Sequence, residues 1–127
     1  MMYIADTHAL VWHLARDDRL GKGARRVLNE ADRGDAEVVV PTIVLAEVLY
    51  LSRKADVSFD SLIDFIKDAR NYSAYPLGLN VVSAMRKLAP EYSIHDAAIV
   101  ATSRILDAPV ITKDEVIRRL GDAKVIW

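Results

Sequence analysis

The chain has 127 residues, of which 52% are hydrophobic and 28% charged, and its net charge is -1 at pH 7. This length suits one domain over residues 1–127, and the balanced charge excludes a global basic field of the kind that attracts nucleic acids. The chain has no cysteine, which excludes disulfides and thiolate metal sites. We expect a cytoplasmic protein without a signal peptide, and no apolar run approaches the roughly 20 residues that a membrane span requires.

The first part of the chain alternates short, continuously apolar runs with stretches of helical periodicity. The expected elements are, in order, a strand over 3–5, helices over 7–15 and 20–31, and a strand over 37–40. The strands are apolar throughout, so both of their faces are expected to be buried.

One carboxylate interrupts the apolar run from Ile43 to Leu51. This run predicts a helix that follows an N-cap at Thr42, reaches about Lys54 and is buried on most of its surface. Glu47 lies beyond the first turn, so capping does not explain it, and burying it is costly without a positive or hydrogen-bonding partner. The alternatives are a buried salt bridge to an arginine or lysine, and a bound metal ion that other parts of the chain also hold.

The second part of the chain continues the alternation of strands and helices. The expected elements are a connection over 56–58, a helix over 59–66 capped by Ser58, a strand over 72–77 in which Pro76 suggests either the end of the strand or a sheet edge, a helix over 80–89 capped by Asn80, a helix over 93–106, a strand over 109–112, a helix over 114–120 ended by Gly121, and a strand over 125–126. This order predicts an α/β fold of three layers, α/β/α, with helices on both faces of a parallel sheet.

Four acidic residues are expected at one edge of this sheet: Asp6, Glu47, Asp96 and Asp114. In open parallel sheets, ligands bind beyond the carboxyl ends of the strands. The three aspartates each have a structural alternative, since Asp6 and Asp114 suit helix N-termini and Ser93 to Asp96 matches a capping box. Taken together, converging carboxylates repel one another unless a cation joins them. Oxygen donors favour Mg²⁺ or Mn²⁺ over zinc, and such a site suits phosphodiester hydrolysis.

The chain resembles PIN-domain ribonucleases, and more closely the VapC-type toxins of bacterial and archaeal toxin–antitoxin pairs. The resemblance covers essentially the whole chain and rests on Ile4-Ala5-Asp6-Thr7-His8-Ala9-Leu10-Val11-Trp12, Val40-Pro41-Thr42 leading to Ala46-Glu47, Asp96-Ala97-Ala98-Ile99-Val100-Ala101-Thr102-Ser103, and Val110-Ile111-Thr112-Lys113-Asp114. It implies a sheet of four or five parallel strands. It also implies metal ligation and catalysis by Asp6, Glu47, Asp96 and Asp114, supported by Thr112 and Thr7.

The same resemblance implies Mg²⁺ or Mn²⁺ as cofactor, single-stranded or structured RNA as substrate, homodimerisation, and inhibition by a VapB-like antitoxin. One departure concerns the third acid. The most similar subgroup often has a proline and a second aspartate before it and an arginine after it, whereas Ser93-Ile94-His95 precede Asp96 here and Ala97 follows it. This departure leaves the flanking contacts and the substrate choice open.

A basic patch and three histidines complete the candidate residues. Arg16, Arg19, Arg25 and Arg26 are candidate RNA contacts through phosphates, although a solvated helix face is favoured. The roles of His8 and His95 are left open, and His13 is expected on a helix surface. Trp12 is expected in the core or at an interface.

Two other functions compete with a nuclease. Asp6 after the first strand, with Thr112-Lys113, also suits phosphoryl transfer through an aspartyl nucleophile, as in receiver or haloacid-dehalogenase-like domains. Against this, no second acid follows within two residues of Asp6, and Glu47 is left unexplained. The other competitor is a non-catalytic binding module, which the intact set of four acids disfavours.

Overall fold

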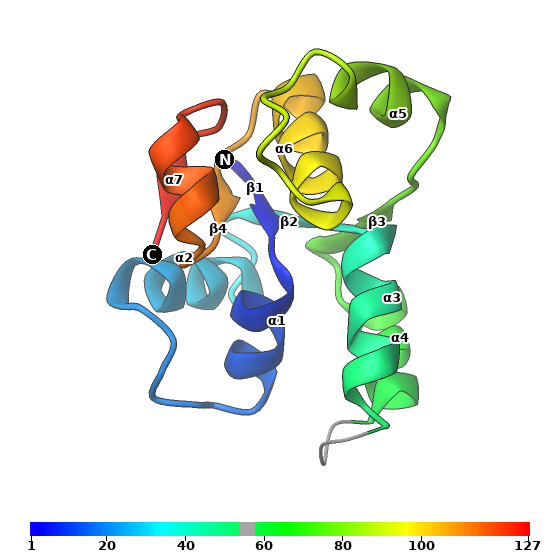
Figure 1. Cartoon of the computed structure of the whole chain (residues 1–127). Helices are drawn as coiled ribbons and strands as arrows, with labels where there is room; N and C mark the ends of the chain where they lie inside the picture. The colour runs from blue at the N-terminus through cyan, green and yellow to red at the C-terminus, as the bar shows by residue number, and fades with distance from the viewer. Residues whose placement is uncertain (54–57) are drawn as a thin grey trace.

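The computed structural model describes residues 1–53 and 58–127, and within these ranges five strands form one parallel sheet of order β3-β2-β1-β4-β5 (Figure 1). The strands are β1 (Met2–Ala5), β2 (Glu37–Pro41), β3 (Tyr72–Tyr75), β4 (Val110–Ile111) and β5 (Val125–Ile126). The predicted α/β fold is confirmed, and the strand for which Pro76 suggests an end or a sheet edge is the edge strand β3.

Helices cover both faces of the sheet, as the continuously apolar strands predict. They are α1 (Thr7–Leu14), α2 (Lys22–Asp32), α3 (Thr42–Leu51), α4 (Phe59–Asp68), α5 (Leu79–Met85), α6 (Ile94–Leu106) and α7 (Glu115–Leu120). Figure 1 shows α5 and α6 on one side of the sheet and α1 and α2 on the other. Strand β1 is central, and its Ile4 is fully buried between Val39 of β2 and Val110 of β4. None of the helices in the described ranges combines the length and apolar character that crossing a membrane requires.

The helix ends follow local capping chemistry where the sequence supplies a side chain for it. Ser58 Oγ accepts a hydrogen bond from the Ser61 amide at 3.2 Å, and Gly121 ends α7 with a left-handed φ of 74°. The predicted bounds of α5 are wrong. Gly78 is its N-cap, Asn80 lies inside the helix and donates to Tyr75 Oη at 3.0 Å, and the helix ends at Met85.

Helix α3 is less buried than its composition predicts. Only Val44 and Val48 are buried among its residues, and Tyr50 is 64% exposed, so the expectation of a helix buried on most of its surface is wrong. Figure 1 shows α3 beside α4, extending away from the sheet. Pro41, not Thr42, is its N-cap, and Thr42 Oγ1 instead accepts from the Leu77 amide at 3.0 Å. Helix α3 ends at Leu51, short of the predicted end at Lys54. Lys54 itself and most of the 56–58 connection lie outside the described residues.

A polar contact joins α1, α2 and β3. Asp32 Oδ2 lies 2.8 Å from His13 Nε2, and Asp32 Oδ1 accepts from Tyr72 Oη at 2.8 Å. Only 10% of the His13 side chain is exposed, so its expected place on a helix surface is wrong. Burial and the Asp32 carboxylate both raise the pKa of the Tyr72 phenol, which therefore stays protonated as a donor.

Replacing Gly23 by alanine is expected to destabilise the fold, although alanine favours helices by about 1 kcal/mol over glycine. A β-carbon at Gly23 lies 2.7 Å from the backbone oxygen of Trp127. Overpacking of this kind costs about 1–3 kcal/mol, which outweighs the gain in helix propensity. Urea unfolding monitored by circular dichroism measures the change, and a stabilisation of about 1 kcal/mol contradicts this contact.

Candidate active site

Asp6 is fixed at the carboxyl edge of the sheet by two neighbouring strand ends. It directly follows β1, and Thr112 directly follows β4. Asp6 Oδ1 accepts from the Thr7 amide at 2.6 Å, and Asp6 Oδ2 accepts from Thr112 Oγ1 at 2.5 Å. Thr112 Oγ1 also accepts from the Asp114 amide at 3.0 Å, so one buried hydroxyl connects two of the four acids.

The three aspartates lie at or near helix N-termini, as their structural alternatives predict, and they also lie at one edge of the sheet. Asp6 is the N-cap of α1, and Asp114 caps α7 by accepting from the Ile117 amide at 2.9 Å. Asp96 stands in the first turn of α6, where Ser93 Oγ accepts from its amide at 3.1 Å. Capping therefore positions these side chains and does not remove them from the edge.

Asp114 and Asp6 lie close enough to Asp96 for their charges to influence its protonation. Burial, and then the charges of Asp114 and Asp6, raise the pKa of Asp96. Burial also acts to raise the pKa of Asp6, but the contacts with His95, Thr112 and the Thr7 amide outweigh it, and the pKa is lowered. Asp6 is thus held ionised, and Asp96 carries the repulsion of the cluster.

Glu47 reaches this edge through a histidine. Its Oε2 lies 2.6 Å from His95 Nε2, which is 3.7 Å from Asp6 Oδ1 and 3.4 Å from Thr7 Oγ1. The contact with Asp6 raises the pKa of His95 against the effect of burial, and the charges of Glu47, Asp6 and Asp96 act in the same direction. From the sequence, the role of His95 stayed open and the salt-bridge partner considered for Glu47 was an arginine or lysine. The pair of Glu47 and His95 was therefore not predicted.

The chemistry of the donors fits a hard divalent cation, because Asp6, Asp96 and Asp114 supply oxygen atoms whose mutual repulsion a cation relieves. Within residues 1–53 and 58–127, however, no three histidine, aspartate or glutamate side chains are already arranged to hold an ion. The carboxylates of Asp6 and Asp114 accept hydrogen bonds from donors of the protein. A cation that enters here must exchange some of these contacts for ligand bonds.

The predicted basic patch is mostly engaged within the protein. Arg19 pairs with Asp17 at 2.7 Å, Arg26 pairs with Glu30 at 3.2 Å, and Arg25 donates to the backbone oxygen of Asp17 at 3.3 Å. Arg16 is exposed and has a positive φ of 54°. These contacts agree with the solvated helix face that the sequence favours, so the patch does not by itself form a binding site.

Lys113 is a basic residue of the site that the sequence suggested only for the phosphoryl-transfer alternative. It stands between Thr112 and Asp114, is exposed, and places its Nζ 4.5 Å from the centre of the Trp12 ring. Arg19 lies over the same ring at 4.6 Å. Among the ion pairs of the described residues, none includes Lys113. Its position beside Thr112 was the available signal. Trp12 itself is buried, as predicted.

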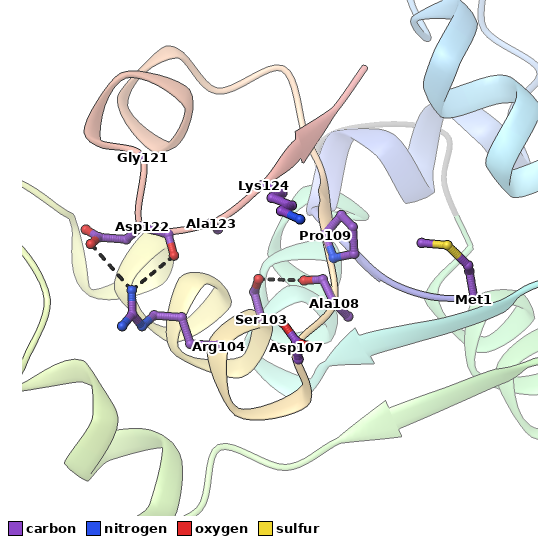
Figure 2. Close-up of a pocket in the computed structure, with 10 residues that line it drawn as sticks. All are labelled: Met1, Ser103, Arg104, Asp107, Ala108, Pro109, Gly121, Asp122, Ala123 and Lys124. Carbon is purple, nitrogen blue, oxygen red and sulfur yellow. Dashed lines mark hydrogen bonds and ion pairs between the residues drawn. The ribbon is translucent and has the colours of Figure 1, made fainter.

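A hollow of about 530 Å³ lies at the other end of the strands, near Met1 and Pro109 (Figure 2). Ser103 Oγ donates there to the backbone oxygen of Ala108 at 2.6 Å, and Arg104 contacts Asp122. None of the four acids lines this hollow. The candidate site is therefore the acidic edge, which capping and strand order assemble.

Neutralising Asp96 is expected to stabilise the metal-free fold. Because the pKa of Asp96 is raised on folding from 3.8, its charged form is disfavoured in the native state. In EDTA at pH 7, Asp96→Asn should raise the free energy of unfolding by up to about 1 kcal/mol, because solvent screens the charge of this partly exposed group. The gain should vanish below pH 3.8, where Asp96 is protonated in both states. Urea unfolding at several pH values measures it, and a gain that grows toward low pH contradicts the sign.

Comparison with known proteins gives one family and several structures. The PIN domain family model matches residues 3–123. No curated protein matches the chain. VapBC2 from Rickettsia felis, bound to a DNA fragment from its promoter, is similar with a TM-score of 0.73 and 16% identity over 98% of this chain and 97% of that chain. VapBC-1 from nontypeable Haemophilus influenzae is similar with a TM-score of 0.69 and 17% identity over 98% of this chain and 96% of that chain. The PIN domain endonuclease Utp24 is similar with a TM-score of 0.53 and 18% identity over 93% of this chain and 74% of that chain. At these identities the structures share the fold.

Proposed function

Because the chain belongs to the PIN domain family, we propose that it is a metal-dependent endoribonuclease and the toxin of a VapBC-type pair. The observation that carries this proposal is the meeting of Asp6, Asp96 and Asp114 at one sheet edge, where burial and then the charges of Asp114 and Asp6 raise the pKa of Asp96. Such a cluster costs stability unless it serves a bound cation. The similarity to VapBC complexes and to the endonuclease Utp24 supports the same assignment.

A bound Mg²⁺ or Mn²⁺ would supply Lewis-acid polarisation of a phosphodiester and a more acidic water. The protein's own contribution is to hold the ligands. Thr112 and the Thr7 amide keep both oxygens of Asp6 at the edge, and the caps of α6 and α7 fix Asp96 and Asp114. Glu47 contacts His95, whose Nε2 lies 3.7 Å from Asp6 Oδ1.

The nuclease assay uses a 5′-labelled single-stranded RNA and the purified full chain. Cleavage is expected with Mg²⁺ or Mn²⁺, and the products should carry 5′-phosphate and 3′-hydroxyl ends. Excess EDTA should stop the reaction, and added Mn²⁺ should restore it. Cleavage that persists in EDTA would remove metal dependence from the proposal, and covalent labelling of Asp6 by acetyl phosphate would favour the aspartyl-nucleophile alternative instead.

We assign the substrate side of the site to Lys113 more than to the four arginines. Its ammonium group rests on Trp12 beside the acids and has no carboxylate partner in the described ranges. A cation on an aromatic face loses little when it turns to a phosphate. Arg19, by contrast, is held by both oxygens of Asp17.

Lys113→Gln is expected to weaken RNA binding by the loss of one phosphate contact. In an Asp6→Asn background, which keeps the RNA uncut, the slope of log affinity against log salt should shrink by about 0.7 to 1. Fluorescence anisotropy at several salt concentrations measures this slope. Lys124→Gln, an exposed lysine at the opposite hollow, is the matched control and should leave the slope unchanged. Equal slopes in all three proteins contradict the assignment.

The proposed partners are a VapB-like antitoxin and a second copy of this chain. The solved structures of VapBC complexes support an antitoxin partner. Co-expression with the product of a short adjacent gene, followed by size-exclusion chromatography with light scattering, tests both. Failure of any co-expressed small protein to bind and inhibit the nuclease would contradict the toxin assignment and leave the nuclease assignment standing.

A further inference from the structure

We propose that His95 is a metal ligand, so that the site combines nitrogen and oxygen donors and prefers Mn²⁺ to Mg²⁺. This inference rests on the proposed metal-dependent function and deepens it by naming a ligand outside the four acids. His95 stands in the part of the sequence that departs from the pattern of related toxins, directly before Asp96.

The geometry places the imidazole where a shared cation is expected. His95 Nε2 lies 2.6 Å from Glu47 Oε2 and 3.7 Å from Asp6 Oδ1. Neighbouring donors of an octahedral ion bound at about 2.1 Å lie about 3 Å apart, and these two distances bracket that value. The three side chains come from α3, from the end of β1 and from α6, so elements distant in sequence converge on this nitrogen.

The backbone of His95 is held while its ring has room to adjust. Ser93 caps α6 at the Asp96 amide and thereby fixes the first turn, in which His95 and Asp96 are consecutive. About a quarter of the His95 side chain, 23%, is exposed, as is 33% of the Glu47 side chain. A small shift of these two partly exposed groups opens their hydrogen bond to an entering ion.

The residue type separates ligation from simple charge compensation. A lysine or arginine would neutralise Glu47 equally well, but neither has a lone pair to offer a metal, whereas imidazole is a common metal ligand. Imidazole nitrogen suits the first-row transition metals, of which Mn²⁺ binds most weakly, while Mg²⁺ prefers oxygen and keeps its waters. A histidine among the four acids is therefore expected to strengthen the preference for Mn²⁺ over Mg²⁺ relative to a site of carboxylates alone.

The test measures metal binding, not catalysis. Isothermal titration calorimetry gives Mn²⁺ and Mg²⁺ affinities for the wild-type chain, His95→Ala and His8→Ala. His8 is exposed, stands two residues after Asp6, and its ring centre lies 5.2 Å from that of Trp12, so it is the matched control. We expect His95→Ala to lose about tenfold or more in Mn²⁺ affinity and to change Mg²⁺ affinity little. His8→Ala should change neither. Co²⁺ bound to the wild-type chain should show an absorption spectrum that His95→Ala alters.

Two outcomes overturn the proposal. One is an unchanged ratio of Mn²⁺ to Mg²⁺ affinity in His95→Ala, and the other is an increase in both affinities, which would mean that His95 only competes for Glu47. His95→Asn keeps a polar side chain and repeats the measurement if His95→Ala fails to fold. The two proposals can fail separately. If EDTA stops cleavage but His95→Ala leaves the ratio of Mn²⁺ to Mg²⁺ affinity unchanged, only the His95 assignment is wrong. If Mn²⁺ binding depends on His95 but the chain does not cleave RNA, only the nuclease proposal is wrong.

Discussion

Asp6→Asn is expected to lower RNA cleavage by at least about a hundredfold, because changes even to residues that only support metal ligands cost 10- to 100-fold. The amide of asparagine has nearly the same shape as the carboxylate, but it carries no charge. It also presents a donor to either Thr112 or the Thr7 amide, both of which now donate to Asp6. The hydroxyl of Thr112 can reorient, whereas the backbone amide cannot, so the fold is expected to tolerate the change better than the chemistry does.

Initial rates on the labelled RNA at saturating Mn²⁺ measure this loss, and circular dichroism confirms that the variant is folded. Asp107→Asn is the matched control. Asp107 ends α6 at the opposite edge of the sheet with a left-handed φ of 49°, a conformation that asparagine tolerates well. The Asp107→Asn variant should cleave the RNA at the wild-type rate. Comparable rates for Asp6→Asn and Asp107→Asn would show that the reaction does not use this edge.

Ile99→Ala is expected to cause the largest loss of stability, about 2–5 kcal/mol, because truncation of a buried isoleucine removes its burial and leaves a cavity. Ile99 is fully buried in the main core where α6 packs on the sheet. Against a typical total of about 5–15 kcal/mol, a loss of this size leaves part of the population unfolded at physiological temperature.

The same helix supplies the control for this prediction. Ile94 is 73% exposed at the first position of α6, and Ile94→Ala should change the free energy of unfolding by no more than about 0.5 kcal/mol. Urea titrations of both variants measure the difference. Similar losses in the two variants would mean that α6 does not pack as described.

Much of the fold could be predicted because its signals are local. Continuous apolar runs predicted strands buried on both faces, and side chains such as Ser58 and Ser93 marked helix starts through bonds made within one turn. The convergence of Asp6 and Asp114 followed from the rule that parallel strands end at one edge. Strand order and residue type were sufficient for these features.

The features that escaped prediction depend on contacts between distant segments. The composition of α3 indicates full burial, yet Tyr50 is 64% exposed because no described element covers that side of the helix. His13, with 10% of its side chain exposed, contacts Asp32, which comes from another helix. Glu47 and His95 are 48 residues apart, and only the packing of α3 beside α6 reveals their contact. The carboxylate that first indicated a metal therefore has a protein partner as well, and the two explanations meet at His95.

The hydroxyl of Thr112 has a consequence for the order in which activity arises during synthesis. Asp6 is among the first residues made, but its second oxygen finds its donor only when residue 112 is available, and the third aspartate of the cluster follows at Asp114. A ribosome-bound chain that ends before this point has α1, β1 and β2 but lacks part of the acidic edge. The proposed cleavage activity should therefore appear only late in translation, after residues 112–114 have been made.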